Sequence, residues 1–453
     1  MELVCPDFSK LVEETRDEIV ELFRDLLRAD TTNTGKMPTG NETRAVVPLK
    51  RKFDEEGIEY EVFSRAEERG NILARLPGEK IGPRLLYLSH LDVVPVEDEA
   101  KWEYSPFGAQ IVENKIYGRG ASDCKDLVAA EAMAFVILKR ANVKPNHEIL
   151  FLASADEEVQ AEYGLRWLLG NHRDKVLTEF AINEGGGVPL EYKGRLLYPL
   201  CTGEKGAFSV EIETFGKSFH SSKPWLGDNA LYHMWRVLER IEKYKSPIDV
   251  SQPIFSELDN LLGVEERPSS ANIDKLIETV DGKDENLADD LIALSRMTLS
   301  PTIIHGGIKS NVVPSYCNLK CSLRTLPDQD EAFVTNEMSK LLEGLSNVRF
   351  KVCHPYSAST SSPFETPLKG AIVTSMRRAL NDDATVIFPT LMPASSDSRL
   401  LRPLGTIVYG FSPLHPAVDK TTCDVHCPNE CTDIRSLLLK TMMLVFLMTT
   451  FSS

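Results

Sequence analysis

Histidines and carboxylates that follow short apolar runs are the residues best suited to chemistry in this chain. Leu85 to Leu88 form an apolar run of strand length, and His90 and Asp92 follow at its carboxyl end. Side chains two residues apart in a strand project from the same face, so His90 and Asp92 should point together. A metal-bound imidazole usually needs a carboxylate or carbonyl that holds its tautomer, and Asp92 can supply one. Taken alone, the pattern equally fits a strand end with two solvated polar residues.

Further segments add carboxylates and a second histidine. A glycine-rich turn delivers Asp123, one apolar run ends in Glu157 and Glu158, and another ends in Glu184. His426 precedes a helix-forming run near the end of the chain. Apolar runs that end in acids, with helical stretches between them, are typical of an open α/β sheet, which binds ligands beyond the carboxyl ends of its strands. Together these segments indicate one cation site.

Imidazole and carboxylate groups are ordinary zinc ligands. Five such ligands are too many for one tetrahedral ion that keeps a position for water. They suit two ions that share a bridging carboxylate and lie about 3.5–4 Å apart. Within the adjacent pair of Glu157 and Glu158, one carboxylate can bind metal while its neighbour accepts a proton.

These motifs occur in the order typical of a known family. From about residue 31 to residue 430, the chain resembles the dinuclear zinc amidohydrolase and exopeptidase family of acetylornithine deacetylase, succinyl-diaminopimelate desuccinylase, aminoacylase and carboxypeptidases G and S. The resemblance implies two zinc ions, for which cobalt can substitute. It assigns His90 and Glu184 to one ion, Glu158 and His426 to the other, Asp123 as the bridge, Asp92 as the residue that orients His90, and Glu157 as the general base. A Glu at position 184 favours the deacetylase, desuccinylase and carboxypeptidase branches, because dipeptidase branches often have Asp there.

The middle of the chain resembles the small inserted domain of this family. Residues 207–215 alternate apolar and polar side chains as a strand does. The resemblance implies an α/β catalytic domain, with a mixed sheet flanked by helices, into which an α+β sandwich that forms the dimer contact is inserted. The expected boundaries are 1–202 and 358–453 for the catalytic domain and 203–357 for the inserted domain.

Within the inserted domain, the resemblance gives roles to His220, Asn311 and Arg324. His220 would polarise the scissile carbonyl from across a homodimer interface, although alone it reads as an ordinary histidine at a helix start. Asn311 and Arg324 would hold a substrate carboxylate, for which the planar guanidinium is well matched. Arg399 could meet a second substrate carboxylate, but the sequence favours a local salt bridge with Asp397.

Composition limits the class of protein and its partners. The 453 residues exceed one ordinary core, so two domains are expected. A net charge of −16 is a poor match for nucleic acid.

The apolar run Met442–Met448 is too short to span a membrane, and we expect it in a buried final helix. The start of the chain lacks a secretory pattern and the nine cysteines are scattered, which favours reduced thiols in the cytoplasm. Cys423, Cys427 and Cys431 could alternatively form a structural zinc or iron–sulfur site.

The sequence therefore predicts a zinc metallohydrolase that cleaves an amide bond next to a free carboxylate. The substrate would be an N-acyl amino acid, as for a deacetylase or desuccinylase, or a short peptide trimmed by a carboxypeptidase. Glu157 would take a proton from the attacking water and pass it to the departing amine, and His220 would help to stabilise the oxyanion. The alternatives are an aminopeptidase or dipeptidase of related fold, and a non-catalytic binding protein on the same fold.

Overall fold

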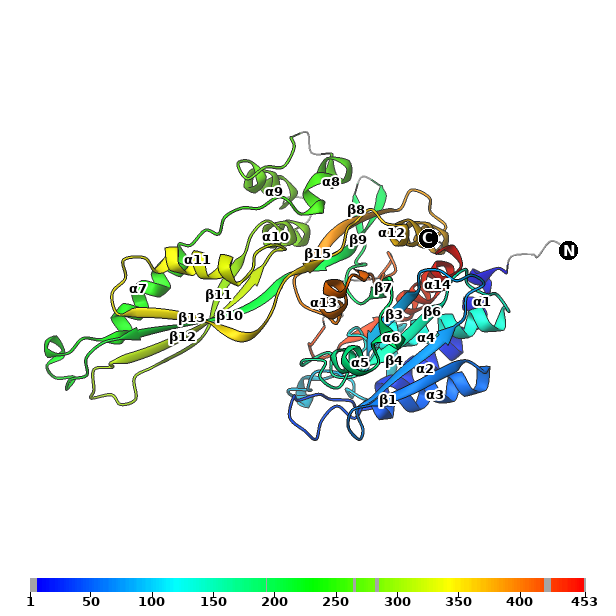
Figure 1. The fold of residues 1–453 in the computed structure, drawn as a ribbon, viewed down its shortest axis with the longest axis horizontal. Coiled ribbons are helices and arrows are strands. Elements are labelled where there is room, and N and C mark those ends of the chain that lie inside the picture. Colours follow the sequence, from blue (N-terminus) through cyan, green and yellow to red (C-terminus); the bar gives the residue numbers. More distant parts are fainter. Residues whose placement is uncertain (1–5, 193, 264–265, 282–284, 419–424, 452–453) are drawn as a thin grey trace. The chain divides into compact units, whose positions relative to one another are not determined.

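The computed structural model describes the chain except for residues 1–5, 193, 264–265, 282–284, 419–424 and 452–453 (Figure 1). The chain divides into two compact units. Unit 1 consists of Met1–Thr202, Ser362–Thr390 and Ser396–Ser453, and unit 2 consists of Gly203–Ser361 and Leu391–Ser395.

A large mixed sheet forms the framework of unit 1. Its strand order is β1-β2-β6-β3-β7-β16-β9-β14, and β8 and β15 both pair with β9. β3 runs parallel to β6 and β7, β16 runs parallel to β7, and the outer pairs β1–β2 and β2–β6 are antiparallel. The bounds are β1 Glu59–Ser64, β2 Gly70–Leu76, β3 Leu85–His90, β6 Ile149–Ser154, β7 Phe180–Asn183, β8 Leu190–Tyr192, β9 Arg195–Glu204, β14 Thr360–Ser361, β15 Val386–Met392 and β16 Ile407–Gly410. A separate small sheet contains β4 Gln110–Val112, β5 Lys115–Tyr117 and β17 Cys431–Asp433.

Helices cover both faces of the large sheet, which is why its inner strands are continuous apolar runs. In β6, Ile149 and Phe151 pack in the cluster that also includes residues of α1–α4, α12 and α14. Leu150 and Leu152 pack on the other face with residues of α5, α6 and α13. The bounds are α1 Phe8–Glu14, α2 Arg16–Arg28, α3 Thr43–Glu56, α4 Lys125–Arg140, α5 Leu165–Asn171, α6 Arg173–Val176, α12 Pro367–Leu380, α13 Ser398–Leu401 and α14 Ile434–Thr450, with short 3-10 helices at η1 Glu99–Lys101 and η3 Arg402–Leu404. The predicted α/β class with a mixed sheet flanked by helices is confirmed.

The two ends of the chain pack on this core. The apolar run Met442–Met448 lies in α14, a helix buried along most of its length, as expected. Among the described residues, no helix is long and apolar enough to cross a membrane. Near the start of the described chain, the helices α1 and α2 meet at Thr15. The Thr15 hydroxyl donates to the carbonyl of Leu11 at 2.7 Å, and this kind of local bond competes with a continuous helix.

Unit 2 is an antiparallel sheet of order β11-β12-β10-β13 with helices packed on it. Alternate residues Phe208, Val210 and Ile212 of β10 are buried with residues of α7 and α11, as their pattern predicted. The bounds are β10 Gly206–Phe215, η2 Pro224–Leu226, α7 Ala230–Glu242, α8 Pro253–Leu262, α9 Ile273–Asp281, α10 Glu285–Leu294, β11 Thr298–Gly306, β12 Tyr316–Thr325, α11 Glu331–Leu342 and β13 Val348–Ser357.

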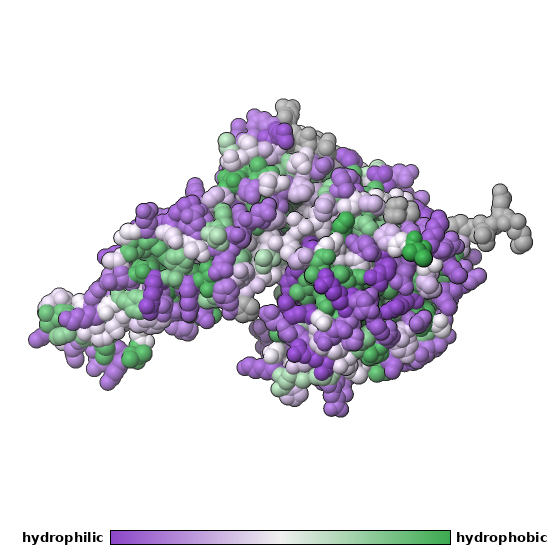
Figure 2. All heavy atoms as spheres, viewed as in Figure 1, coloured by the Kyte–Doolittle hydropathy of each residue, from purple (hydrophilic) through white to green (hydrophobic). Residues whose placement is uncertain are grey.

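Unit 2 exposes apolar side chains on α7 and on the edge strand β11. Tyr232 and Trp235 on α7 are 67% and 60% exposed, and Ile303 and Ile304 on β11 are 48% and 51% exposed. Figure 2 shows hydrophobic residues gathered over this part of unit 2. We call these four residues the α7–β11 patch.

The cysteine-rich segment near the chain end departs from the expectation of reduced thiols. Cys431 is disulfide-bonded, whereas Cys427 carries an exposed free thiol. Cys423 lies outside the described residues. A disulfide sulfur is not a thiolate, so Cys431 is not free to act as a ligand, which argues against the alternative of a structural zinc or iron–sulfur site.

A buried ion pair joins α4 to α14. Asp126 and Lys440 are both almost fully buried, and the ammonium contacts the carboxylate directly. Lys440→Met should destabilise the protein by about 3–5 kcal/mol, because it leaves the Asp126 carboxylate buried without its cation. Lys10→Met is the control, since the Lys10–Glu14 pair is exposed and should contribute less than about 1 kcal/mol. Urea unfolding of both variants measures the loss in the free energy of unfolding. An equally small loss in Lys440→Met and Lys10→Met would contradict the prediction.

Candidate metal centre

The candidate site lies where β3, β6 and β7 end. His90 is the last residue of β3 and pairs in register with Ser154, the last residue of β6. Glu157 and Glu158 follow β6, and Glu184 follows β7 directly. Because parallel strands present their carboxyl ends at the same edge, these three acids and His90 emerge side by side.

Two loops complete the cluster. Asp123 comes from the glycine-containing turn that precedes α4, and His426 comes from the segment before β17. His426 has a positive φ of 62°, an unusual conformation for a residue other than glycine.

The distances divide these side chains into two groups that share Asp123. His90 Nε2 lies 3.0 Å from Asp123 Oδ1 and 3.6 Å from Glu184 Oε2. His426 Nε2 lies 3.0 Å from Asp123 Oδ2 and 3.5 Å from Glu158 Oε2. Each oxygen of one carboxylate therefore faces a different histidine, which is the arrangement that a carboxylate bridging two cations requires.

The hydrogen bonding of His90 leaves one ring nitrogen available. Its Nδ1 lies 3.0 Å from the main-chain carbonyl of Asp92 and 3.6 Å from the Asp92 carboxylate. A carbonyl only accepts hydrogen bonds, so Nδ1 carries a proton, and Nε2 is the ring nitrogen that faces the cluster, where it lies 3.0 Å from Asp123 Oδ1. The main-chain carbonyl of Asp92 therefore orients His90, and the Asp92 carboxylate lies close to the same ring nitrogen.

The site has an excess of buried negative charge. Burial raises the pKa of Glu184 to about 7 and also raises the pKa values of Glu158 and, strongly, Glu157. Burial also acts to raise the pKa of Asp123, but hydrogen bonds from His426 and His90 outweigh it and hold that pKa well below its usual range. Oε1 of Glu158 is buried without a hydrogen-bond partner among the described residues. This donor set fits divalent cations, which would neutralise the carboxylates.

Glu157 is the acid of the cluster that faces an arginine. Arg399 Nη1 lies 3.3 Å from Glu157 Oε1, and burial raises the pKa of Asp397 to about 6 while the positive charge of Arg399 acts to lower it. Asp397 accepts a hydrogen bond from Ser154 at 3.1 Å, and its Oδ1 has no hydrogen-bond partner within the described residues. The long arginine side chain reaches from the start of α13 to the loop after β6, a contact between residues far apart in sequence.

Sequence reasoning missed the residues that shape the two loops. The buried Glu430 carboxylate accepts hydrogen bonds from Arg119 Nη1 at 2.8 Å and from the main-chain N–H groups of Gly120, Ser122 and Asp123 at 3.2, 2.8 and 3.2 Å. Arg119 Nη2 also donates to the carbonyl of His426 at 3.3 Å. One buried ion pair therefore ties the turn that carries Asp123 to the segment that carries His426. The available signal was a glutamate four residues after His426.

The three site residues expected in the inserted domain all lie in unit 2. His220 pairs with Val312 in an isolated bridge, and the carbonyl of Asn311 accepts the N–H of Ser221, so the His220 and Asn311 segments are neighbours. Arg324 lies elsewhere, near the end of β12, opposite Ala207 at the start of β10. The structure brings His220 and Asn311 together but places Arg324 at the other end of the same sheet.

Comparison with known proteins agrees with this arrangement. Residues 86–450 match the sequence pattern of peptidase family M20/M25/M40. The chain belongs to this family. It is therefore a metallohydrolase of the deacylase or peptidase type, which confirms the predicted family and enzyme class.

Individual relatives in the family are distant in sequence but similar over most of their length. The chain is 26% identical over 384 residues to a probable succinyl-diaminopimelate desuccinylase of Staphylococcus aureus, which covers 84% of this chain and 85% of the relative. It resembles the structure of a metallo-carboxypeptidase of Sulfolobus solfataricus with a TM-score of 0.67, 19% identity and coverage of 96% and 98%. A dinuclear metal-binding peptidase of Bacillus subtilis gives a TM-score of 0.61, 14% identity and coverage of 96% and 98%.

The metal-free protein should lose stability as the pH rises from about 6.5 to about 10. Hydrogen bonds to Asp123 and Glu158 raise the pKa of His426 from 6.5 to about 10. The folded state therefore holds this proton more tightly than the unfolded chain does. The stabilisation that this bound proton gives to the folded state is complete below the pKa of His426 in the unfolded chain, about 6.5. It is lost as the pH rises through the pKa of His426 in the folded state.

Urea unfolding of chelator-treated protein across this pH range tests the effect. His426→Ala should show a smaller loss of stability with rising pH than the unsubstituted protein. His354→Ala, which removes an exposed histidine of β13, is the control. Equal pH dependence in His426→Ala and the unsubstituted protein would contradict the prediction.

Proposed function

We propose that the protein binds two zinc ions and that cobalt can replace them. In this proposal, His90 and Glu184 bind one ion, Glu158 and His426 bind the other, and Asp123 bridges them. The observation that carries the proposal is the position of Asp123, whose two oxygens each lie 3.0 Å from a different histidine Nε2. Imidazole and carboxylate are favourable zinc ligands, and the bound ions would supply Lewis-acid activation of the substrate carbonyl and of water.

Glu157 is the proposed general base. It is almost fully buried, and its main-chain N–H donates to Asp92 at 3.0 Å, which fixes the backbone that carries its side chain. Glu157 takes a proton from the attacking water and later donates it to the departing amine. Arg399 Nη1 lies 3.3 Å from the Glu157 carboxylate and holds it in place.

The proposed substrate carries a free carboxylate next to the amide bond. Arg324 has neither an ion-pair nor a hydrogen-bond partner for its side chain among the described residues, so its guanidinium is available for a carboxylate. Asn311 lies beside His220 at the other end of the sheet, so it would reach the same carboxylate from a partner chain. The substrate is an N-acyl amino acid or a short peptide. Similarity to the probable desuccinylase favours the first, and similarity to the metallo-carboxypeptidase favours the second.

Separate substitutions of the adjacent glutamates test the proposed chemistry. With zinc-loaded protein and a panel of N-acyl amino acids and dipeptides, Glu157→Ala should lower kcat by about 10²–10⁴-fold and keep two zinc ions per chain. Glu158→Ala should instead lower the zinc content. Glu97→Ala, a substitution in the exposed loop after β3, is the control for loss of an acid. Loss of zinc in Glu157→Ala with turnover per bound metal unchanged would reverse the two assignments.

A homodimer is proposed for two reasons. Ala207 pairs with Arg324 and Phe215 pairs with Tyr316, so Arg324 and the end of β10 that leads to His220 are about 27 Å apart along the strand. His220 and Arg324 of one chain therefore cannot act on one small substrate, whereas residues from two chains can. The α7–β11 patch supplies exposed apolar side chains beside an unpaired strand edge, as a subunit interface requires.

Mixing two inactive variants tests the shared site. His220→Ala and Glu157→Ala proteins should each be inactive, and a heterodimer would contain one site with both residues intact. Random exchange of equal amounts makes about half of the dimers hetero, so activity should recover to about one quarter of that of the unsubstituted enzyme. A fully active monomer, or no recovery after subunit exchange has been demonstrated, would contradict the proposal.

We also propose a cytoplasmic location, without nucleic-acid or membrane partners. Free thiols at Cys124, Cys317 and Cys321 support a reducing compartment, and the disulfide of Cys431 opposes it. The net charge of −16 supports the absence of a nucleic-acid partner.

A further inference from the structure

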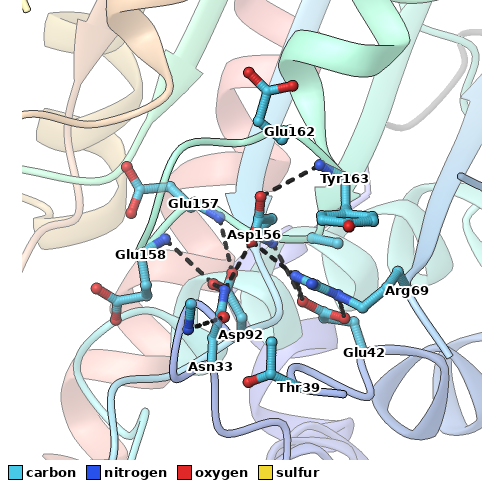
Figure 3. Close-up of polar contacts among 12 residues, drawn as sticks. Asn33, Thr39, Glu42, Arg69, Asp92, Asp156, Glu157, Glu158, Glu162 and Tyr163 are labelled. Atoms are coloured by element: carbon cyan, nitrogen blue, oxygen red, sulfur yellow. Dashed lines mark hydrogen bonds and ion pairs between the residues drawn. The ribbon is translucent and has the colours of Figure 1, made fainter. Parts of the chain in front are cut away.

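A buried network lies beneath the Glu157–Glu158 pair, and its residues come from distant parts of the chain. Figure 3 shows that the carboxylate of Asp92 receives the main-chain N–H groups of both glutamates. These bonds measure 3.0 Å from Glu157 and 3.2 Å from Glu158. Asp92 thus fixes the backbone of the two residues that the proposed function gives different roles.

Asn33 connects Asp92 to the residue that begins this turn. Its side-chain amide donates to Asp92 Oδ2 at 2.8 Å and to Asp156 Oδ1 at 2.9 Å. Asp156 has a φ of +66°, a backbone conformation that residues with a side chain rarely adopt. The unusual conformation must be held by the surroundings of Asp156, which include the N–H of Tyr163 at 3.3 Å from its Oδ2.

Arg69 provides the charge that makes this network stable. Its guanidinium donates to both oxygens of Glu42, at 2.7 and 2.8 Å, and to Asp156 Oδ1 at 2.8 Å. It is 1% exposed and lies over the ring of Tyr163, 4.5 Å from the ring centroid (Figure 3). Arg69 therefore compensates buried carboxylates while it holds Asp156 in place.

We propose that Arg69 is a positioning residue that sets the directions of the Glu157 and Glu158 side chains. It touches neither glutamate and acts through Asp156, Asn33 and Asp92. Adjacent residues in an extended or turn backbone diverge, so a fixed turn can direct Glu158 towards the metal ligands and Glu157 towards the reacting water. The assignment of these two roles rests on the proposed function. The effect of Arg69 on the conformation of the turn does not depend on that function.

Arg69→Lys is the variant that tests the proposal, because lysine keeps the charge and loses the fork that joins Glu42 to Asp156. It should lower zinc affinity and kcat by about 10–100-fold each, as removal of a residue that supports a metal ligand does. KM should change by less than about threefold, since the groups proposed to bind the substrate carboxylate lie in unit 2. Zinc binding measured by calorimetry and amide hydrogen exchange of the segment 155–159 give readouts apart from activity, and exchange there should become faster.

Two further variants separate positioning from stability. Arg65→Lys is the matched control, because Arg65 also lies over Tyr163, at 5.3 Å, but is half-exposed and pairs with Glu162 instead of Asp156. It should leave zinc affinity, kcat and exchange unchanged. The double variant Arg69→Met/Glu42→Gln removes a buried ion pair as a unit, so it should be more stable than Arg69→Met while zinc affinity and kcat stay low.

Three outcomes distinguish the possibilities. Reduced zinc affinity and kcat in both Arg69→Lys and the double variant would support positioning. Full recovery of both quantities in the double variant, or unchanged values in Arg69→Lys, would show that Arg69 only stabilises the fold and would overturn the proposal. Absence of zinc binding and hydrolysis in the unsubstituted protein would refute the proposed function instead, and faster hydrogen exchange in Arg69→Lys would still establish the effect on the turn.

Discussion

The mutual repulsion of buried carboxylates is the constraint on which the site depends. Asp123, Glu157, Glu158 and Glu184 converge at one edge of the sheet, where burial raises the pKa values of the three glutamates. The protein supplies two histidines and Arg399 against these four acids. Divalent cations would remove the repulsion, and the same repulsion explains why the acids need rigid support. A cluster of like charges spreads apart unless its backbone is fixed.

That support comes from buried charges outside the cluster. Glu430 and Arg119 join the two loops that carry Asp123 and His426. The two side chains pair with each other, and each also binds main-chain groups of a loop. Asp92 and Arg69 do the same for the turn after β6. In both cases the sheet places the residues approximately, and a buried ion pair or carboxylate fixes the backbone at its edge. The fold and the chemistry are therefore connected through hydrogen bonds to the main chain.

The sequence predicts the parts of the site that follow from periodicity. His90, Glu158 and Glu184 end apolar runs, and their convergence follows from parallel strand pairing. Contacts made by long side chains could not be predicted in this way. The pairing of Arg399 with Glu157 depends on how α13 packs beside the loop after β6, and the role of Arg69 depends on three segments that meet only in the folded chain.

Anomalous diffraction from crystals of zinc-loaded protein, recorded at the zinc absorption edge, tests the central assignment most directly. Two peaks should lie about 3.5–4 Å apart, one beside His90 and Glu184 and the other beside Glu158 and His426, with an Asp123 oxygen bound to each. A single peak, or two peaks that do not share Asp123, would contradict the account.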